Sequence, residues 1–180
     1  ARLLQAGLDT PAGLVLPLRA SGEGEDVVWE TSPWPLRRER LYLLAGDSPL
    51  GLRLPLASLP HVLPDDEDRE PPVDPFAPRG ALPRRGRAAR GRVRGGKPRE
   101  VIRTALGVEA RGGHLRVFLP PLERLEAAVA LFHAIEAAAE DAGAAIVVEG
   151  YPPPRDPRLS MLAVTPDPGV IEVNIHPASS

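Results

Sequence analysis

Apolar positions recur at helical spacing between residues 122 and 139. Pro120 and Pro121 come just before this stretch, and proline suits a first helical turn because that turn leaves its N–H groups unpaired in any case. Gly143 is a typical residue for the C-terminal stop of a helix. The pattern therefore predicts one long helix that opens at Pro120–Pro121, ends at Gly143 and buries a face made of Leu122, Leu125, Val129, Phe132, Ile135 and Ala139.

Short apolar or alternating stretches on both sides of this helix indicate strands. In the C-terminal half they cover residues 101–109, 114–119, 144–148, 159–165 and 170–176. Arg111-Gly112-Gly113 and Pro168-Gly169 supply turns between successive strands. The order strand–strand–helix–strand–strand–strand predicts an α+β fold, with a mixed, largely antiparallel sheet covered by one long helix.

The N-terminal third of the chain has a weaker pattern. Short apolar stretches at residues 13–18 and 41–44 indicate strands, and Trp29 and Trp34 lie on either side of a proline-broken turn. We interpret residues 1–63 as a β-rich part of the same domain.

Composition narrows the classes of function. The 180 residues include 23 prolines and 17 glycines, which excludes a long coiled coil and predicts much loop. Cysteine is absent, so a disulfide framework, a thiolate metal site and a cysteine nucleophile are excluded. No apolar run approaches the roughly 18 residues that a membrane span needs, so we expect a cytoplasmic protein that does not bind a membrane.

Charge is strongly segregated under a net charge of -2. Residues 65–70 are acidic, and residues 79–103 contain ten of the 22 lysines and arginines with one acid. Such a polar stretch, rich in Pro and Gly, buries too little apolar surface to offset its ordering entropy. We therefore predict a disordered insert over residues 64–99, between residues 1–63 and an α+β core over residues 100–180, within one incomplete domain.

The arginines of this insert have two interpretations. One is a polybasic arm that binds nucleic acid or an acidic partner, and the other is a solvated linker. No aromatic residues interleave with the arginines to stack on bases, which favours the linker and argues against a nucleic-acid partner.

The last predicted strand carries a row of polar groups. Strand side chains alternate between faces, so Ile171, Val173 and Ile175 point one way. The opposite face presents a carboxylate, an amide and an imidazole, from Glu172, Asn174 and His176. Ligand-type groups in a row suit a divalent cation and its anionic substrate. A solvent-facing edge strand explains the same row equally well.

Glu149 and two arginines add further candidate groups. Glu149 ends an apolar strand, a position at which a glutamate is also often merely solvated. Arg155 and Arg158 lie in a loop stiffened by four prolines, which favours bidentate recognition of phosphate or carboxylate. The alternative is a surface salt bridge to Asp156 or Asp167, which contributes little to stability.

The register between the strands stays open at this point. If Glu149 and Glu172 lie on parallel neighbours, they occupy opposite ends, and Glu149 meets only Asn174 or His176. The sequence alone does not decide which glutamate binds a metal.

Four stretches of the chain together resemble a known family. They are residues 29–56, 118–126, 149–159 and 164–177. The run Glu-Gly-Tyr-Pro-Pro-Pro-Arg-Asp-Pro-Arg at 149–158 is long and specific. In these residues the chain is similar to the amidoligase domain of large bacterial transglutaminase-like proteins, and the resemblance covers nearly the whole chain outside the insert.

The resemblance implies a fold and a chemistry. The family is assigned to the carboxylate–amine ligases, whose fold is related to that of glutamine synthetase, so we expect a partial glutamine synthetase-like catalytic sheet. Those enzymes use ATP and Mg²⁺ to make an acyl phosphate that an amine attacks. By resemblance, the metal ligands are Glu149, Glu172 and Asn174, the nucleotide contacts are Asn174, His176 and Arg155, and the catalytic arginines are Arg155 and Arg158.

The resemblance also implies partners. The substrates are carboxylates and amines of small molecules or peptides, and the parent chain carries a transglutaminase-like domain upstream. Ser160-Met161 stand where the family commonly has Asn-His, and its members run longer on both sides. We therefore expect a fragment that is inactive alone. The alternative is a non-catalytic module that supports the transglutaminase-like domain.

Overall fold

A computed structural model describes most of residues 13–35, all of residues 101–174 and shorter ranges between them. The described residues are 13–22, 26–35, 41, 44–45, 52–53, 59, 74, 76–86, 90–93 and 101–174. These residues form eleven strands and one helix.

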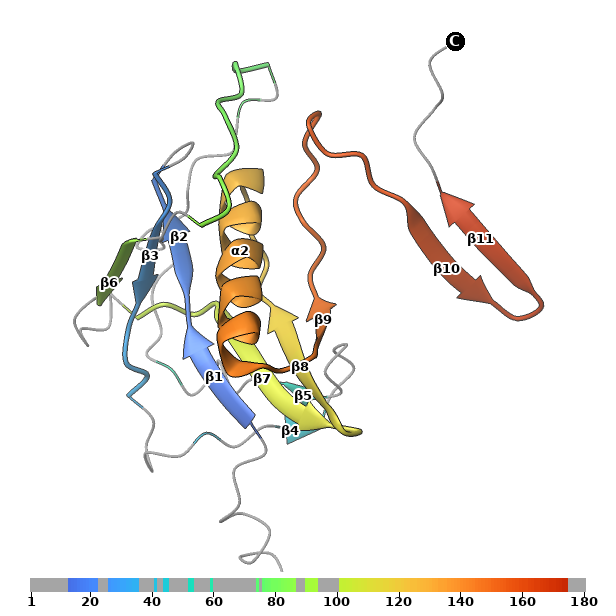
Figure 1. The fold of residues 1–180 in the computed structure, drawn as a ribbon, viewed down its shortest axis with the longest axis horizontal. Coiled ribbons are helices and arrows are strands. Elements are labelled where there is room, and N and C mark those ends of the chain that lie inside the picture. The colour runs from blue at the N-terminus through green and yellow to red at the C-terminus, as the bar shows by residue number, and fades with distance from the viewer. Residues whose placement is uncertain are drawn as a thin grey trace, which may run out of the picture.

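A four-stranded sheet covered by one helix forms the body of the protein (Figure 1). The strand order is β1-β7-β8-β9, and β1 pairs with β7, and β7 with β8, in antiparallel fashion, whereas β8 and β9 are parallel. The bounds are Gly13–Pro17 for β1, Ala105–Arg111 for β7, His114–Leu119 for β8, Leu125–Ala142 for α2 and Ile146–Gly150 for β9.

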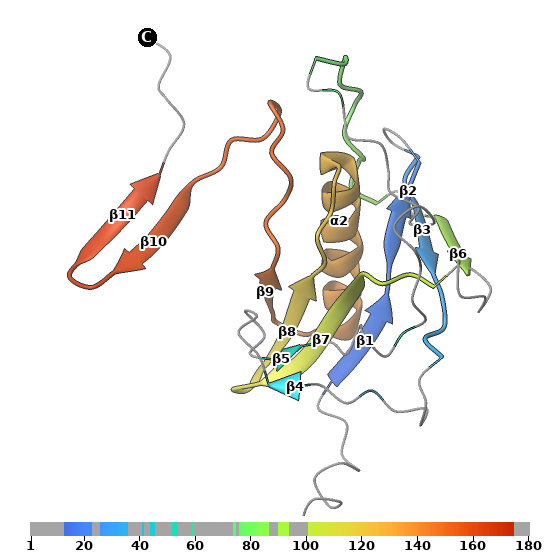
Figure 2. The same cartoon turned by 180° about the vertical axis from the view of Figure 1, so that it is seen from behind.

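Seven further strands form three small sheets. β2 and β6 both pair with β3, β4 pairs with β5, and β10 pairs with β11. In both views the β10–β11 hairpin stands apart from the body (Figures 1 and 2). The bounds are Arg19–Ser21 for β2, Val28–Thr31 for β3, Leu44–Ala45 for β4, Leu52–Arg53 for β5, Arg90–Val93 for β6, Ala163–Asp167 for β10 and Val170–Asn174 for β11.

The structure confirms the predicted fold class and the element order of the C-terminal half. β7, β8, α2, β9, β10 and β11 follow one another as two strands, a helix and three strands. Gly112 and Gly113, with φ angles of 60° and 78°, form the predicted turn between β7 and β8. Gly143 adopts the left-handed conformation at the end of α2.

The start of the helix differs from the prediction. α2 begins at Leu125, and Arg124 before it is still extended, with φ −121° and ψ 138°. Leu119 and Pro120 both precede a proline, and the bulk of a proline ring disfavours the helical conformation of the residue before it. The two prolines therefore end β8 instead of opening the helix.

β7 also starts later than predicted, at Ala105 instead of residue 101. The Ile102 N–H donates to the Ser32 hydroxyl over 2.7 Å, and the Thr104 carbonyl accepts from the Leu18 N–H over 2.9 Å. Residues 101–104 therefore join the sheet to the N-terminal segments before the ladder begins.

Some residues of the predicted insert, 74, 76–86 and 90–93, lie within the described ranges. β6 pairs in parallel with β3, and the Arg85 guanidinium lies 3.0 Å from Glu136 and 2.7 Å from Glu140 on α2. Composition could not reveal these partners, because they lie far away in sequence. The other residues of 64–99 lie outside the described ranges. The prediction of a disordered insert stays a prediction.

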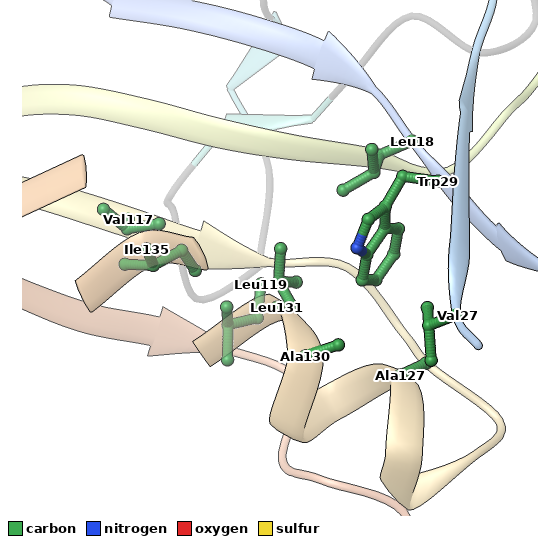
Figure 3. Close-up of a cluster of buried hydrophobic side chains, with 9 residues drawn as sticks. All are labelled: Leu18, Val27, Trp29, Val117, Leu119, Ala127, Ala130, Leu131 and Ile135. Atoms are coloured by element: carbon green, nitrogen blue, oxygen red, sulfur yellow. The ribbon is translucent and has the colours of Figure 1, made fainter. Parts of the chain in front are cut away.

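One core joins the helix, the main sheet and the β2–β3 unit. Val117 and Leu119 point from β8 toward Leu131 and Ile135 of α2, and Trp29 of β3 enters from the side (Figure 3). The Trp29 indole lies beside Leu18 and points toward small residues of α2, Ala127 and Ala130. Alanine at these positions leaves room for the indole. The core thus lies on the helix side of the sheet.

Candidate functional site

The face of the sheet opposite α2 carries four charged residues. β-Strand residues alternate between faces, and Val117 of β8 packs in the core on the helix side. Arg116 is therefore on the other face, and it lies directly opposite Glu109 of β7. We call Glu109, Arg111, Arg116 and Glu149 the sheet-face cluster.

Ion pairs connect the members of this cluster. Arg111 Nη2 donates to Glu149 Oε2 over 2.7 Å, and Arg116 Nη1 donates to Glu149 Oε1. Arg111 Nη1 lies 3.6 Å from Glu109 Oε2. Each glutamate side chain is only 20% exposed, so water screens these pairs less than it does at an open surface. Two carboxylates and two guanidiniums thus alternate across three strands.

Glu149 is held in its charged form. Burial acts to raise its pKa, but hydrogen bonds and charge from Arg116 and Arg111 outweigh this, and the pKa of Glu149 lies below its usual value. The carboxylate is therefore ionised at neutral pH.

Two atoms of the cluster are buried without a hydrogen-bond partner among the described residues. They are the acceptor Glu109 Oε2 and the donor Arg116 Nε. Most buried polar atoms in proteins are hydrogen-bonded, so each exception calls for an explanation. A bound cation would satisfy the acceptor, and a bound anion would satisfy the donor.

The proline loop after β9 is fastened to the start of α2. Arg158 donates to both carboxylate oxygens of Asp156, over 2.8 Å each, and to Glu126 Oε1 over 2.7 Å. It also donates to the Gly80 carbonyl over 2.6 Å. Hydrogen bonds from Arg158 lower the pKa of Asp156 to about 2. We call Glu126, Asp156 and Arg158 the loop clamp.

The structure separates the residues that the sequence suggested as one site. Glu149 belongs to the sheet-face cluster, and Arg158 to the loop clamp. Arg155 is exposed. Glu172 and Asn174 lie in β11, in the hairpin that stands apart from the body (Figure 1). His176 lies outside the described residues.

The described residues do not assemble a metal site. Within the described ranges, no group of three or more His, Asp or Glu residues could hold a metal ion. The metal set Glu149, Glu172 and Asn174 therefore stays a prediction.

Sequence reasoning missed three members of the cluster, namely Glu109, Arg111 and Arg116. A signal was present, because charged residues stand at 109, 111 and 116 on a hairpin whose intervening positions include Val108, Leu115 and Val117. Spacing by two on paired strands places such residues on one face. The missing step was the pairing of Glu109 with Arg116.

Fold and site together define an α+β protein with a helix on one face of its sheet and a charged cluster on the other. A family model described as "Putative amidoligase enzyme (DUF2126)" matches residues 1–180. The chain therefore belongs to this amidoligase family, which supports a ligase-like function at the level of the family. No curated protein and no solved structure matches the chain. Among the described residues, no helix is long and apolar enough to cross a membrane.

Proposed function

We propose that this chain is part of an ATP- and Mg²⁺-dependent carboxylate–amine ligase, which forms amide or peptide bonds, and that the sheet-face cluster belongs to its site. The observation that carries the proposal is that two buried atoms of the cluster, Glu109 Oε2 and Arg116 Nε, have no hydrogen bond among the described residues, although the Arg111 guanidinium lies 3.6 Å from Glu109 Oε2. They offer an acceptor and a donor on directly opposed residues. A metal ion and a phosphate would satisfy both.

The chemistry of the cluster fits these two ligands. Magnesium prefers oxygen ligands, and Glu109 offers a carboxylate oxygen without a hydrogen bond among the described residues, whereas both oxygens of Glu149 accept from arginines. Guanidinium groups bind phosphate oxygens in a fixed fork, which Arg111 and Arg116 supply. ATP, when bound, supplies the phosphoryl group that activates a carboxylate for attack by an amine.

The residues of the chain would share this work. Arg116 and Arg111 would bind phosphate and stabilise its negative charge. Glu149, which pairs with both, positions their guanidiniums. Arg158 is engaged in the loop clamp and holds the proline loop, whereas Arg155 is exposed and remains a proposed phosphate contact.

The residues of the last strand keep their proposed roles. Glu172 and Asn174 would add metal and nucleotide ligands, and His176 would contact the nucleotide, as the family resemblance implies. Their participation requires the hairpin to reach the sheet-face cluster.

The ion pairs of the insert argue against the interpretation that it is an arm that binds nucleic acid. Arg85 pairs with Glu136 and Glu140, and Arg79 lies 3.9 Å from Asp156. These two arginines of the basic segment face acids of the same chain. We therefore keep the ligase as the proposed function over a nucleic-acid arm.

Binding of a fluorescent ATP analogue tests the proposal. We expect Mg²⁺-dependent binding by the wild-type protein with its native flanking segments, and at least a tenfold loss in Arg116→Met, because one charged contact to phosphate contributes about 1.5–3 kcal/mol. Arg85→Met is the matched control, since it removes a guanidinium that pairs with α2 instead. Unchanged binding in Arg116→Met, or none in the wild type, would contradict the proposal.

A further inference from the structure

Glu149 lies between the two guanidinium groups of the sheet-face cluster. Its Oε2 accepts a hydrogen bond from Arg111 Nη2 over 2.7 Å, and its Oε1 accepts one from Arg116 Nη1. Guanidinium groups bind the oxygens of a carboxylate and of a phosphate in the same manner. The Glu149 carboxylate therefore occupies the place that the proposed function gives to a phosphate.

The strand register shows that Glu149 reaches its partners along the sheet. Glu149 lies opposite Phe118 in the parallel pairing of β8 with β9, and Arg116 lies two residues earlier in β8. Arg111 is farther away, at the end of β7. The side chain must therefore extend toward the β7–β8 turn to make both contacts. A different rotamer would separate the carboxylate from both arginines without changing the strand pairing.

The carboxylate satisfies the arginines only in part. Arg116 Nε is buried and has no hydrogen-bond partner among the described residues. Both oxygens of Glu149 already accept from other donor atoms, so this carboxylate leaves the Nε–H group unpaired. A phosphate group offers three acceptor oxygens. It can place one oxygen on each guanidinium and still has a third for Nε, so phosphate suits these donors better than a carboxylate does.

Release of Glu149 from the arginines would leave a carboxylate that needs another positive partner. A partly buried charge is costly unless it is paired, and the Glu149 side chain is only 20% exposed. Glu109 Oε2 on the same face also has no hydrogen bond among the described residues, although Arg111 Nη1 lies 3.6 Å away. A Mg²⁺ ion that arrives with the phosphate would supply the charge that both carboxylates then require.

We infer that Glu149 is an internal substitute for the phosphate: it holds Arg111 and Arg116 in the free protein, and a bound phosphate displaces it. The freed carboxylate then turns toward the metal ion, a step that rests on the proposed function. Displacement by phosphate does not itself require a nucleotide. Since only molecules with a withdrawn Glu149 bind the anion, the apparent affinity is reduced by the fraction of such molecules. Metal and phosphate then assist each other's binding.

Isothermal titration calorimetry with inorganic pyrophosphate, in the presence of EDTA, tests the displacement. The protein is used with its native flanking segments. Glu149→Gln is expected to bind pyrophosphate at least about tenfold more tightly than the wild type, because the amide is a weaker competitor for the two guanidiniums. If Glu149 served only to position the arginines, its loss would weaken the binding instead. Unchanged or weaker binding in Glu149→Gln overturns the displacement.

Glu140→Gln is the matched control. It removes the same charge and also releases an arginine, because Arg85 donates to Glu140 of α2 over 2.7 Å. We expect its affinity for pyrophosphate to equal that of the wild type. A gain as large as in Glu149→Gln would show an effect of net charge alone and would overturn the displacement. Malonate, a dicarboxylate, should gain less affinity than pyrophosphate in Glu149→Gln, and an equal gain would overturn the assignment of the site to phosphate.

The wild-type protein offers a test that does not require the Glu149 variant to fold. Binding of pyrophosphate should shift the NMR signal of the Arg116 Nε–H group, which has no partner among the described residues and is assigned by its loss in Arg116→Lys. The Nε–H signal of Arg85 should stay in place. An Arg116 signal that does not move at saturating pyrophosphate overturns the displacement.

The fluorescent ATP analogue tests the turn of Glu149 toward the metal ion. Addition of Mg²⁺ should raise the affinity of the wild type for the analogue at least about tenfold more than that of Glu149→Gln, which lacks the freed carboxylate. An equal gain in both proteins overturns this step. A wild type that binds no nucleotide, together with tighter pyrophosphate binding in Glu149→Gln, contradicts the proposed function and leaves the displacement standing. Nucleotide binding without that gain for pyrophosphate does the reverse.

Discussion

At the scale of single residues, the role of a charged side chain follows from the residues with which it pairs more than from its exposure. Arg158 donates to Asp156, Glu126 and a backbone carbonyl, so it makes the salt bridge to Asp156 that was the alternative to phosphate recognition. Its catalytic role stays a prediction. Glu149 looked like a solitary strand-end carboxylate and has two arginines bound to it.

Asp156 gives the loop clamp a defined pH dependence. Its pKa is lowered from 3.8 to about 2, so the stabilisation is complete above pH 4 and is lost as pH falls through 2. The free energy of unfolding in urea should therefore fall by about 2 kcal/mol across this window from this residue alone.

Asp156→Asn isolates this contribution from other carboxylates with a lowered pKa, Glu149 among them. The variant should be less stable than the wild type at pH 7, and the difference between the two should shrink toward pH 2. A difference that is constant with pH would show that the clamp does not depend on the charge of Asp156.

At the scale of elements, the close approach of the end of β9 to the end of β8 requires a glycine at position 150. Gly150 has a φ of 102°, and a Cβ atom there would lie 2.6 Å from the backbone nitrogen of Leu119 and 2.7 Å from its oxygen. Gly150→Ala should therefore lower the free energy of unfolding by about 3 kcal/mol or more, since it adds a backbone clash to the strain of a positive φ.

Gly143→Ala is the matched comparison. Gly143 also has a positive φ, 60°, but a Cβ atom there meets nothing within 4 Å. The cost should then be about 1–2 kcal/mol, from the left-handed conformation alone. Equal losses for the two variants in urea unfolding would mean that the close approach of β9 to Leu119 does not matter.

The helices and strands also differ in how well the sequence predicts them. The β7–β8 hairpin and α2 were predictable, because two glycines and a helical period are local signals. The meeting of Glu149 with Arg111 and Arg116 depends on which strands become neighbours, and no local pattern encodes that choice. The same holds for β6, whose partner β3 lies about 60 residues earlier. Of the four residues of the sheet-face cluster, sequence reasoning therefore singled out Glu149 alone.

At the scale of the whole molecule, the β2–β3 unit, the main sheet and α2 depend on two tryptophans in different ways. Trp29 lies in the shared core, 9% exposed, and its Nε1 has no hydrogen-bond partner among the described residues. Trp34 Nε1 donates to the Ile102 carbonyl over 2.6 Å, which joins the segment after β3 to the approach to β7. Trp29 contributes buried volume to the core, whereas Trp34 contributes a directed hydrogen bond.

A buried tryptophan is usually more sensitive to substitution than a partly exposed one. Here we expect the opposite: replacement by phenylalanine should lower the free energy of unfolding less at Trp29 than at Trp34. Trp29→Phe keeps most of the apolar contact and removes an unsatisfied donor, so it should change the free energy of unfolding by less than about 1 kcal/mol. Trp34→Phe leaves the Ile102 carbonyl without its donor and should cost about 1–3 kcal/mol. Trp29→Ala, which empties the core, should cost about 3–5 kcal/mol and shows that the position matters. The variants can be compared by urea unfolding, and a larger loss in Trp29→Phe than in Trp34→Phe would contradict this ranking and show that the lost volume of the indole outweighs the lost hydrogen bond.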